Sequence, residues 1–149
     1  MGWHSDARAA IVGLRIHTRP LEILRAGLES VALRFAQVAE AIGRVTPGIR
    51  EVVASGGALL NSPAWTQIMA DVLGNPVIAS GEKEASSRGA ALLALEALGF
   101  APSLDGFSAS MGETFQPHPE IHQIYRRARA RQERLYNLLI NNGTTDEHR

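Results

Sequence analysis

The sequence predicts an α/β fold that is rich in helix and contains a small sheet. From residue 49 onward, strand-like and helical patterns alternate, which is typical of layered α/β proteins. Two short stretches, 49–54 and 76–79, are the expected strands, and each leads into a helical pattern. Two or three strands of this length make a thin sheet, so helices are expected to dominate the domain.

Composition limits the classes of protein that fit. The 149 residues suit one domain or one lobe of a larger protein, and a hydrophobic fraction of 45% is enough for a core. Lys+Arg and Asp+Glu balance at 15 each, which argues against nucleic acid or a membrane surface as a partner. Without cysteine the chain has no disulfide and no thiolate metal site. Apolar runs of about 18 residues and a secretory leader pattern are missing, so a cytoplasmic location is expected.

The clearest predicted helix covers residues 20–42. Thr18 is the expected cap, and Pro20 suits the first turn. Apolar side chains recur at alternating spacings of three and four, which gives one continuous stripe. Because the stripe lasts only about three heptads, we interpret it as a core face rather than a coiled coil. It contains Leu21, Leu24, Leu28, Val31, Phe35, Val38 and Ile42.

The most informative segment is the strand at 49–54, which leads into Gly56 and Gly57. A helix is expected to open directly behind this turn, at Ser62-Pro63. Glycines let a ligand approach the backbone closely, and a helix N-terminus offers free N–H groups and a positive dipole end. This order of strand, glycine turn and helix predicts a nucleotide-facing edge.

The rest of the chain follows the same alternation. Gly89 lies inside a helical pattern, where glycine costs roughly 1 kcal/mol relative to alanine, so we expect a close crossing with another element there. The other expected elements are a brief strand or extended segment at 10–14, helices at 63–73, from Glu82 or Glu84 to 98 and at 119–141, and a loop at 99–117.

Several reactive side chains have a simpler structural interpretation. Asp71 lies near the end of a helix with an apolar side, so a structural hydrogen bond or a solvated position is favoured over catalysis. His118 and His122 are four residues apart, but Pro119 marks a helix start, so we predict no metal site. Ser55 has no His/Asp set beside it and is rejected as a nucleophile. The arginines at 126–134 are expected to form a solvated helix face.

Four segments, in this order, resemble the C-terminal lobe of the FGGY carbohydrate kinases. This family shares the ribonuclease H-like fold of actin, Hsp70 and hexokinase ATPases. The resemblance covers essentially the whole chain, residues 1–149. Among the subfamilies, the chain most resembles the gluconokinases, and the xylulokinases come next. The segments are 7–14, 17–32, 55–58 with Trp65, Gln67, Ala70 and Asp71, and 84–91.

The resemblance implies a site for ATP, with Mg²⁺ accompanying the nucleotide. The glycine turn of the family lies against the adenosine, which here corresponds to Gly56, Gly57 and Ala58. Asn61 occupies the place of an asparagine that approaches the adenine in some members. An amide both donates and accepts, so it suits a base edge, but Asn61 could equally cap the helix behind it.

The resemblance also implies that residues 1–149 are part of a larger kinase. The family's sugar-binding N-terminal lobe, its phosphate hairpin and its catalytic aspartate lie upstream of the matched segments, so no catalytic residue is expected here. The parent protein would phosphorylate a sugar or sugar acid, gluconate being the first candidate, and this chain alone would be inactive. The alternative is a non-catalytic α/β module that forms a homo-oligomer through exposed apolar faces.

Overall fold

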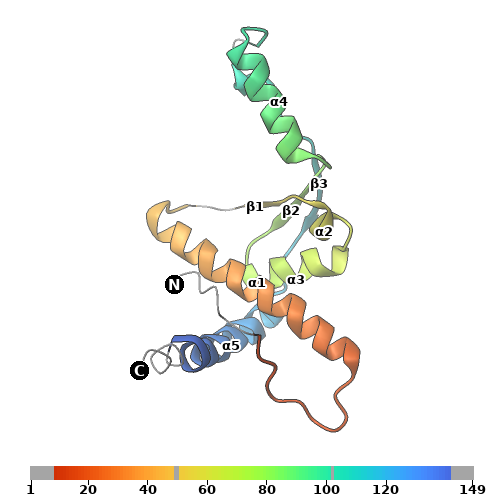
Figure 1. The fold of residues 1–149 in the computed structure, drawn as a ribbon, viewed down its shortest axis with the longest axis vertical. Helices are drawn as coiled ribbons and strands as arrows, with labels where there is room; N and C mark the ends of the chain where they lie inside the picture. Colours follow the sequence, from red (N-terminus) through yellow and green to blue (C-terminus); the bar gives the residue numbers. More distant parts are fainter. Residues whose placement is uncertain (1–8, 49–50, 102, 142–149) are drawn as a thin grey trace, which may run out of the picture.

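The computed structural model describes residues 9–48, 51–101 and 103–141, and it confirms the helix-rich α/β fold with a small sheet (Figure 1). Three helices, α1, α3 and α5, gather on one side of the strands, whereas α4 projects away from them. None of the described helices is both long and apolar enough to span a bilayer. The elements are α1 (Pro20–Val45), β1 (Val52–Ala54), α2 (Gly57–Leu60), α3 (Pro63–Leu73), β2 (Val77–Ser80), α4 (Ala85–Ala97), a 3₁₀ turn (Leu104–Gly106), β3 (Met111–Phe115), α5 (Pro119–Tyr136) and a π-helical turn (Asn137–Asn141).

The sheet has three strands in the order β1-β2-β3. β1 and β2 are parallel, with Val52 opposite Val77, and α3 lies in the crossover between them. β3 runs antiparallel to β2, with Ile78 opposite Thr114. β3 falls inside 99–117, so the prediction of a loop there was wrong. All of β3 except Phe115 is exposed, so the strand is held by pairing with β2 and shows no apolar alternation in the sequence.

Of the two alternatives for residues 10–14, a brief strand or an extended segment, the strand is wrong. The described residues 9–15 are irregular and exposed, and the Ile11 side chain is 63% accessible. A short β-branched run is stable as a strand only when it is paired with a neighbour. The expected strand at 49–54 appears as β1, although residues 49 and 50 lie outside the described part.

The core lies where α1, α3 and α5 meet the sheet. α1 contributes small side chains to it, which lets α3 approach closely, and Trp65 Nε1 donates to the carbonyl oxygen of Leu28 at 3.3 Å. The helix starts one residue later than Thr18 predicted, since Arg19 is the N-cap and its N–H donates to Glu22 at 2.8 Å. The buried apolar residues here are Ala32, Leu33, Ala36, Ala54, Met69, Ala70, Val72, Val77 and Tyr125.

The apolar stripe of α1 does not form the core, so the prediction of a core face was wrong. The buried side of α1 is the neighbouring face, which carries Ala32, Leu33 and Ala36. Of the seven stripe residues, Leu28 is half-buried and the other six are exposed, from 41% at Val31 to 72% at Leu21. The buried face is the one whose alanines allow α3 and α5 to approach closely, and the face with the largest side chains is exposed.

α4 has no buried residue and stands apart from the three-helix core (Figure 1). A side chain built at Gly89 would meet nothing within 4 Å, so no close crossing exists there among the described residues. The base of α4 is fastened to the segment before β3. Arg88 donates to the carbonyl oxygen of Ser108 at 3.1 Å, and the N–H of Ser110 donates to Glu82 at 3.3 Å.

We predict that Gly74→Ala destabilises the protein more than Gly99→Ala. Both glycines have a positive φ, 68° and 77°, so alanine costs roughly 1–2 kcal/mol at either position. At Gly74 a new Cβ would lie 2.6 Å from the His122 ring, whereas at Gly99 it meets nothing within 4 Å. The clash should add about 1–3 kcal/mol at Gly74. Urea denaturation measures both losses, and equal losses would show that His122 yields freely.

Candidate functional site

The glycine turn presents bare backbone to solvent. Gly56 has a φ of 92°, which an L side chain rarely adopts, and a Cβ built there would have no heavy atom within 4 Å. Its carbonyl oxygen accepts from the N–H groups of Leu59 and Leu60, at 3.2 and 3.1 Å. The turn is therefore fixed by its own hydrogen bonds while one side stays open to a flat ligand.

The other predicted site residues lie next to Gly56 on α2. Gly57 begins this single turn, and a Cβ there would contact only the side-chain nitrogen of Asn61, at 3.5 Å. Gly57, Ala58 and Asn61 are all exposed. The structure thus brings the four predicted residues together on one small surface. Whether that surface holds nucleotide stays a prediction.

The position of Asn61 separates the two roles considered for it. Ser62, not Asn61, is the N-cap of α3, and neither α2 nor α3 has a side-chain cap bond. The backbone N–H of Asn61 donates to Gly57 at 3.0 Å and so ends α2. The helix-capping alternative for its side chain is therefore wrong, and the amide is left exposed beside the glycines.

The sequence interpretation missed α2. The helix expected to open at Ser62-Pro63 is confirmed as α3, but an additional helical turn, α2, lies between it and the glycines. The signal lay in Leu59 and Leu60, a short apolar pair that is half-buried. Thr66 holds this turn against α3, because its hydroxyl donates to the carbonyl oxygen of Leu59 at 3.0 Å.

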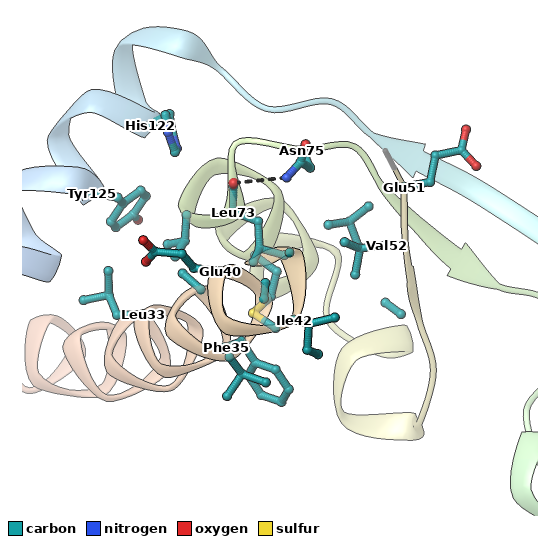
Figure 2. A pocket seen from close by; sticks show the side chains of 18 of the residues that line it. Leu33, Phe35, Glu40, Ile42, Glu51, Val52, Leu73, Asn75, His122 and Tyr125 are labelled. Atoms are coloured by element: carbon teal, nitrogen blue, oxygen red, sulfur yellow. Dashed lines mark hydrogen bonds between the residues drawn. The ribbon is translucent and has the colours of Figure 1, made fainter. Parts of the chain in front are cut away.

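A cavity of about 860 Å³ lies behind the glycine turn, between α1, β1, α3 and α5 (Figure 2). Ala54, Ser55 and Leu59 line it, but the four predicted site residues do not. In Figure 2, Phe35 and Ile42 border it from α1, and His122 and Tyr125 stand on α5. Its walls are mainly apolar, and the chief charged pair on them is Glu40 with Arg129. The predicted site is thus an open surface beside this cavity.

Asp71 has the structural role that the sequence favoured. It is 6% exposed, and its carboxylate accepts from the N–H of His118 at 2.8 Å and from the side chain of Gln67 at 3.1 Å. The Nδ1 of His118 lies 3.0 Å from the same oxygen. Because His118 is the N-cap of α5, Asp71 fastens the start of α5 to α3.

The other residues matched beside Asp71 are also contacts of α3. Trp65 reaches α1 through Leu28, as described above, and Gln67 donates to the carbonyl oxygen of Gln116 at 2.8 Å, just before α5. Ala70 is fully buried. These residues therefore pack α3 against α1 and the start of α5.

His118 and His122 do not act as a pair. His122 bonds through Nδ1 to the carbonyl oxygen of Asp71, at 2.9 Å, and its ring lies against Gly74. Within the part of the chain that the structure describes, no three His, Asp or Glu side chains gather where they could hold a metal ion.

A buried hydroxyl joins α5 to α1. Tyr125 donates to Glu29 at 2.9 Å, and Arg25 donates to the same carboxylate oxygen at 2.8 Å. Burial raises the pKa of the Tyr125 hydroxyl, and the bond to Glu29 raises it further, whereas Arg25 opposes the change. The pKa of Arg25 is raised chiefly by its hydrogen bond to Glu29.

We predict that Tyr125 makes the fold lose stability in alkaline solution. An unfolded tyrosine ionises near about pH 10, whereas the folded one keeps its proton to higher pH. Above about pH 10 the unfolded state therefore binds fewer protons, so the free energy of unfolding falls as pH rises. Urea denaturation at about pH 9 and about pH 11 should show a smaller decline in Tyr125→Phe than in the wild type.

Tyr136→Phe is the matched control for this experiment. It removes the other of the two tyrosines and leaves the Tyr125–Glu29 bond in place. If Tyr125→Phe and the wild type decline equally, the hydroxyl of Tyr125 is not the group responsible.

We predict that Asp71→Ala costs about 1–3 kcal/mol of stability, because it leaves buried donors at the start of α5 without an acceptor. Asp71→Asn should cost clearly less, since it keeps one oxygen for the His118 N–H. Denaturation midpoints measure the difference. A similar loss in both variants would show that charge, and not hydrogen-bond acceptance, matters at this position.

Comparison with known proteins identifies the class. The structure is similar to carbohydrate kinases, which confirms the actin- and hexokinase-like ATPase fold. Residues 1–98 match the C-terminal domain of the FGGY family of carbohydrate kinases, and the chain belongs to this family.

Individual relatives carry several substrate names. The glycerol kinase of Renibacterium salmoninarum is 36% identical over 139 residues, covering 93% of this chain and 27% of that protein. The xylulose kinase of Lactobacillus acidophilus is 25% identical with a TM-score of 0.80, and the gluconate kinase of the same organism is 25% identical with a TM-score of 0.79. Each of these two structures covers 92% of this chain and is itself covered to 28%. The chain thus spans about a quarter of the length of its relatives.

Proposed function

We propose that this chain is the nucleotide-side part of an ATP-dependent carbohydrate kinase. The observation that carries the proposal is the open backbone at Gly56 and Gly57, with the Asn61 amide beside it. The family of the chain supports the choice of a kinase, and its share of its relatives' length supports a partial domain. We assign no catalytic residue to the chain and expect the base that deprotonates the acceptor hydroxyl to lie outside it.

The described residues suit a nucleoside. A Cβ at Gly56 would meet nothing within 4 Å and one at Gly57 would meet only the Asn61 side chain, so a flat ring system can lie against the peptide planes beside this amide. The Asn61 amide offers a donor and an acceptor to the edge of a base. Mg-ATP, when bound, supplies the phosphoryl group and the charge that stabilises its transfer. This chain would contribute orientation of the adenosine.

The acceptor is proposed to be a sugar or sugar acid, with gluconate as the first candidate. Similarity to a solved gluconate kinase at 25% identity supports gluconate, while a solved xylulose kinase is also 25% identical and a glycerol kinase is more similar in sequence, at 36% identity. We propose that residues outside this chain choose among these acceptors, and that the parent protein works in the cytoplasm without nucleic-acid or membrane partners.

A second candidate function is a non-catalytic module that self-associates. The exposed apolar stripe of α1 favours it, because contiguous apolar surface promotes association. The two candidates differ in one measurable respect. Only the kinase part should be stabilised by Mg-ATP.

We predict that Mg-ATP raises the melting temperature of the chain and that Gly57→Val abolishes the rise. Nucleotide at about ten times its dissociation constant stabilises a protein by about 1.4 kcal/mol, or a few degrees at this size. Gly57 has an ordinary helical backbone, so valine is tolerated by the fold while its methyl groups fill the open space. Thermal unfolding with and without Mg-ATP measures both effects.

Gly57→Ala is the matched control, because its Cβ makes only ordinary contact with Asn61. It should keep most of the rise in melting temperature. If Mg-ATP raises the melting temperature of Gly57→Val as much as that of the wild type, the nucleotide does not bind at this turn. The pure chain is expected to transfer no phosphate to gluconate, xylulose or glycerol, and turnover by it would refute the assignment as a partial domain.

A further inference from the structure

Three consecutive side chains at the start of α3 reach three different elements. Trp65 bonds to α1, and Gln67 bonds to the segment before α5. Thr66, between them, reaches α2, because its hydroxyl donates to the carbonyl oxygen of Leu59 at 3.0 Å. Trp65 and Gln67 are among the residues that resemble the family, whereas Thr66 is not, so the role of Thr66 follows from its contacts alone.

The Thr66 hydroxyl is buried, and its shorter contact lies outside its own helix. The residue is 2% exposed. A threonine inside a helix commonly donates to the carbonyl oxygen four residues earlier. Here that acceptor, on Ser62, is 3.3 Å away, whereas the Leu59 carbonyl oxygen is closer, at 3.0 Å. The hydroxyl has one proton, so the shorter bond, which joins α3 to α2, takes the larger share of it.

α2 has few other means of holding its position. It is a single turn of four residues, too short to be stable alone, and no side chain caps it. Of its residues, Leu59 packs against the core cluster. The Leu59 carbonyl oxygen also accepts from the N–H of Ser62 at 3.0 Å. Leu59 is therefore the point where α2 joins the core, through its side chain, and α3, through Thr66.

The predicted site residues depend on this attachment at Leu59. Gly57, Ala58 and Asn61 are exposed. The N–H of Leu59 donates to the Gly56 carbonyl oxygen at 3.2 Å, and the N–H of Asn61 donates to Gly57 at 3.0 Å. Both glycines and the asparagine thus belong to the same hydrogen-bonded turn as Leu59, so a shift of Leu59 would move them together.

We propose that Thr66 is a positioning residue for the nucleotide. By fixing the Leu59 carbonyl, it holds the glycine turn and the Asn61 amide in the arrangement that receives the adenosine. The inference rests on the function proposed above and adds to it a residue that sets the affinity of the site. Because Thr66 is buried, it touches no ligand and acts through α2. Without the hydroxyl the turn can take other orientations, and the nucleotide has to select one of them at a cost in affinity.

We predict that Thr66→Val raises the dissociation constant of Mg-ATP about fivefold to tenfold, because one hydrogen bond that orders the site is lost. Thr66→Ser keeps the hydroxyl and should bind Mg-ATP like the wild type. A role in packing alone would give the opposite order, since valine keeps the shape of threonine and serine lacks a methyl group. Isothermal titration calorimetry with Mg-ATP measures all three chains.

Tyr125→Phe is the matched control for this titration. It also removes a hydroxyl bond of a buried side chain, but the bond joins α5 to α1 and lies away from the glycine turn. The dissociation constant of Mg-ATP should therefore stay at the wild-type value. An equal weakening in Tyr125→Phe and Thr66→Val would show that general loosening of the fold, and not the position of α2, sets the affinity.

Hydrogen exchange tests the inference without any nucleotide. In Thr66→Val the amides of Leu60 and Asn61, which close α2, should exchange about fivefold faster than in the wild type. The amide of Gly74, at the end of α3, should keep its rate. Unchanged exchange in α2 overturns the inference, as does wild-type affinity for Mg-ATP in Thr66→Val. A wild-type chain that binds no Mg-ATP overturns the proposed function, and this inference with it.

Discussion

The Asp71 carboxylate is the interaction on which the arrangement of helices depends. It fixes His118, the N-cap of α5, to α3, while Trp65 on the same helix bonds to α1. Along the chain, α3 is part of the connection between the parallel strands β1 and β2, and it packs beside α2. One helix therefore positions the sheet, both long helices and the glycine turn. Trp65, Gln67 and Asp71, which resemble the family's signature on α3, are the residues that make these contacts in the structure.

Sequence patterns predicted the elements that local chemistry decides. β1, β2, α1, α3 and the glycine turn follow from β-branched runs, helical periodicity and glycine, and all of them are present. β3 was missed because pairing with β2 stabilises it, without buried side chains of its own. The four predicted site residues do come together on one surface. α2 depends on a contact with α3 seven residues further on, and the cavity behind the turn is lined by elements far apart in sequence.

The largest disagreement concerns α1, and it has a physical reason. Periodicity identifies the face with the greatest apolar area, but it does not say what covers that face. Alanines let α3 and α5 approach α1 closely, so a neighbouring face is buried and the apolar stripe of α1 is left exposed. A chain that spans about a quarter of its relatives' length can thus hold a sound core and still expose side chains suited to a partner.

The hydrogen bonds inside the glycine turn have a thermodynamic consequence. Because the Gly56 carbonyl is already held by two amides of α2, the turn is rigid before any ligand arrives. A molecule that lies against it would lose its own freedom but would not have to order the loop. Preorganisation of this kind makes even a small, shallow contact surface energetically efficient.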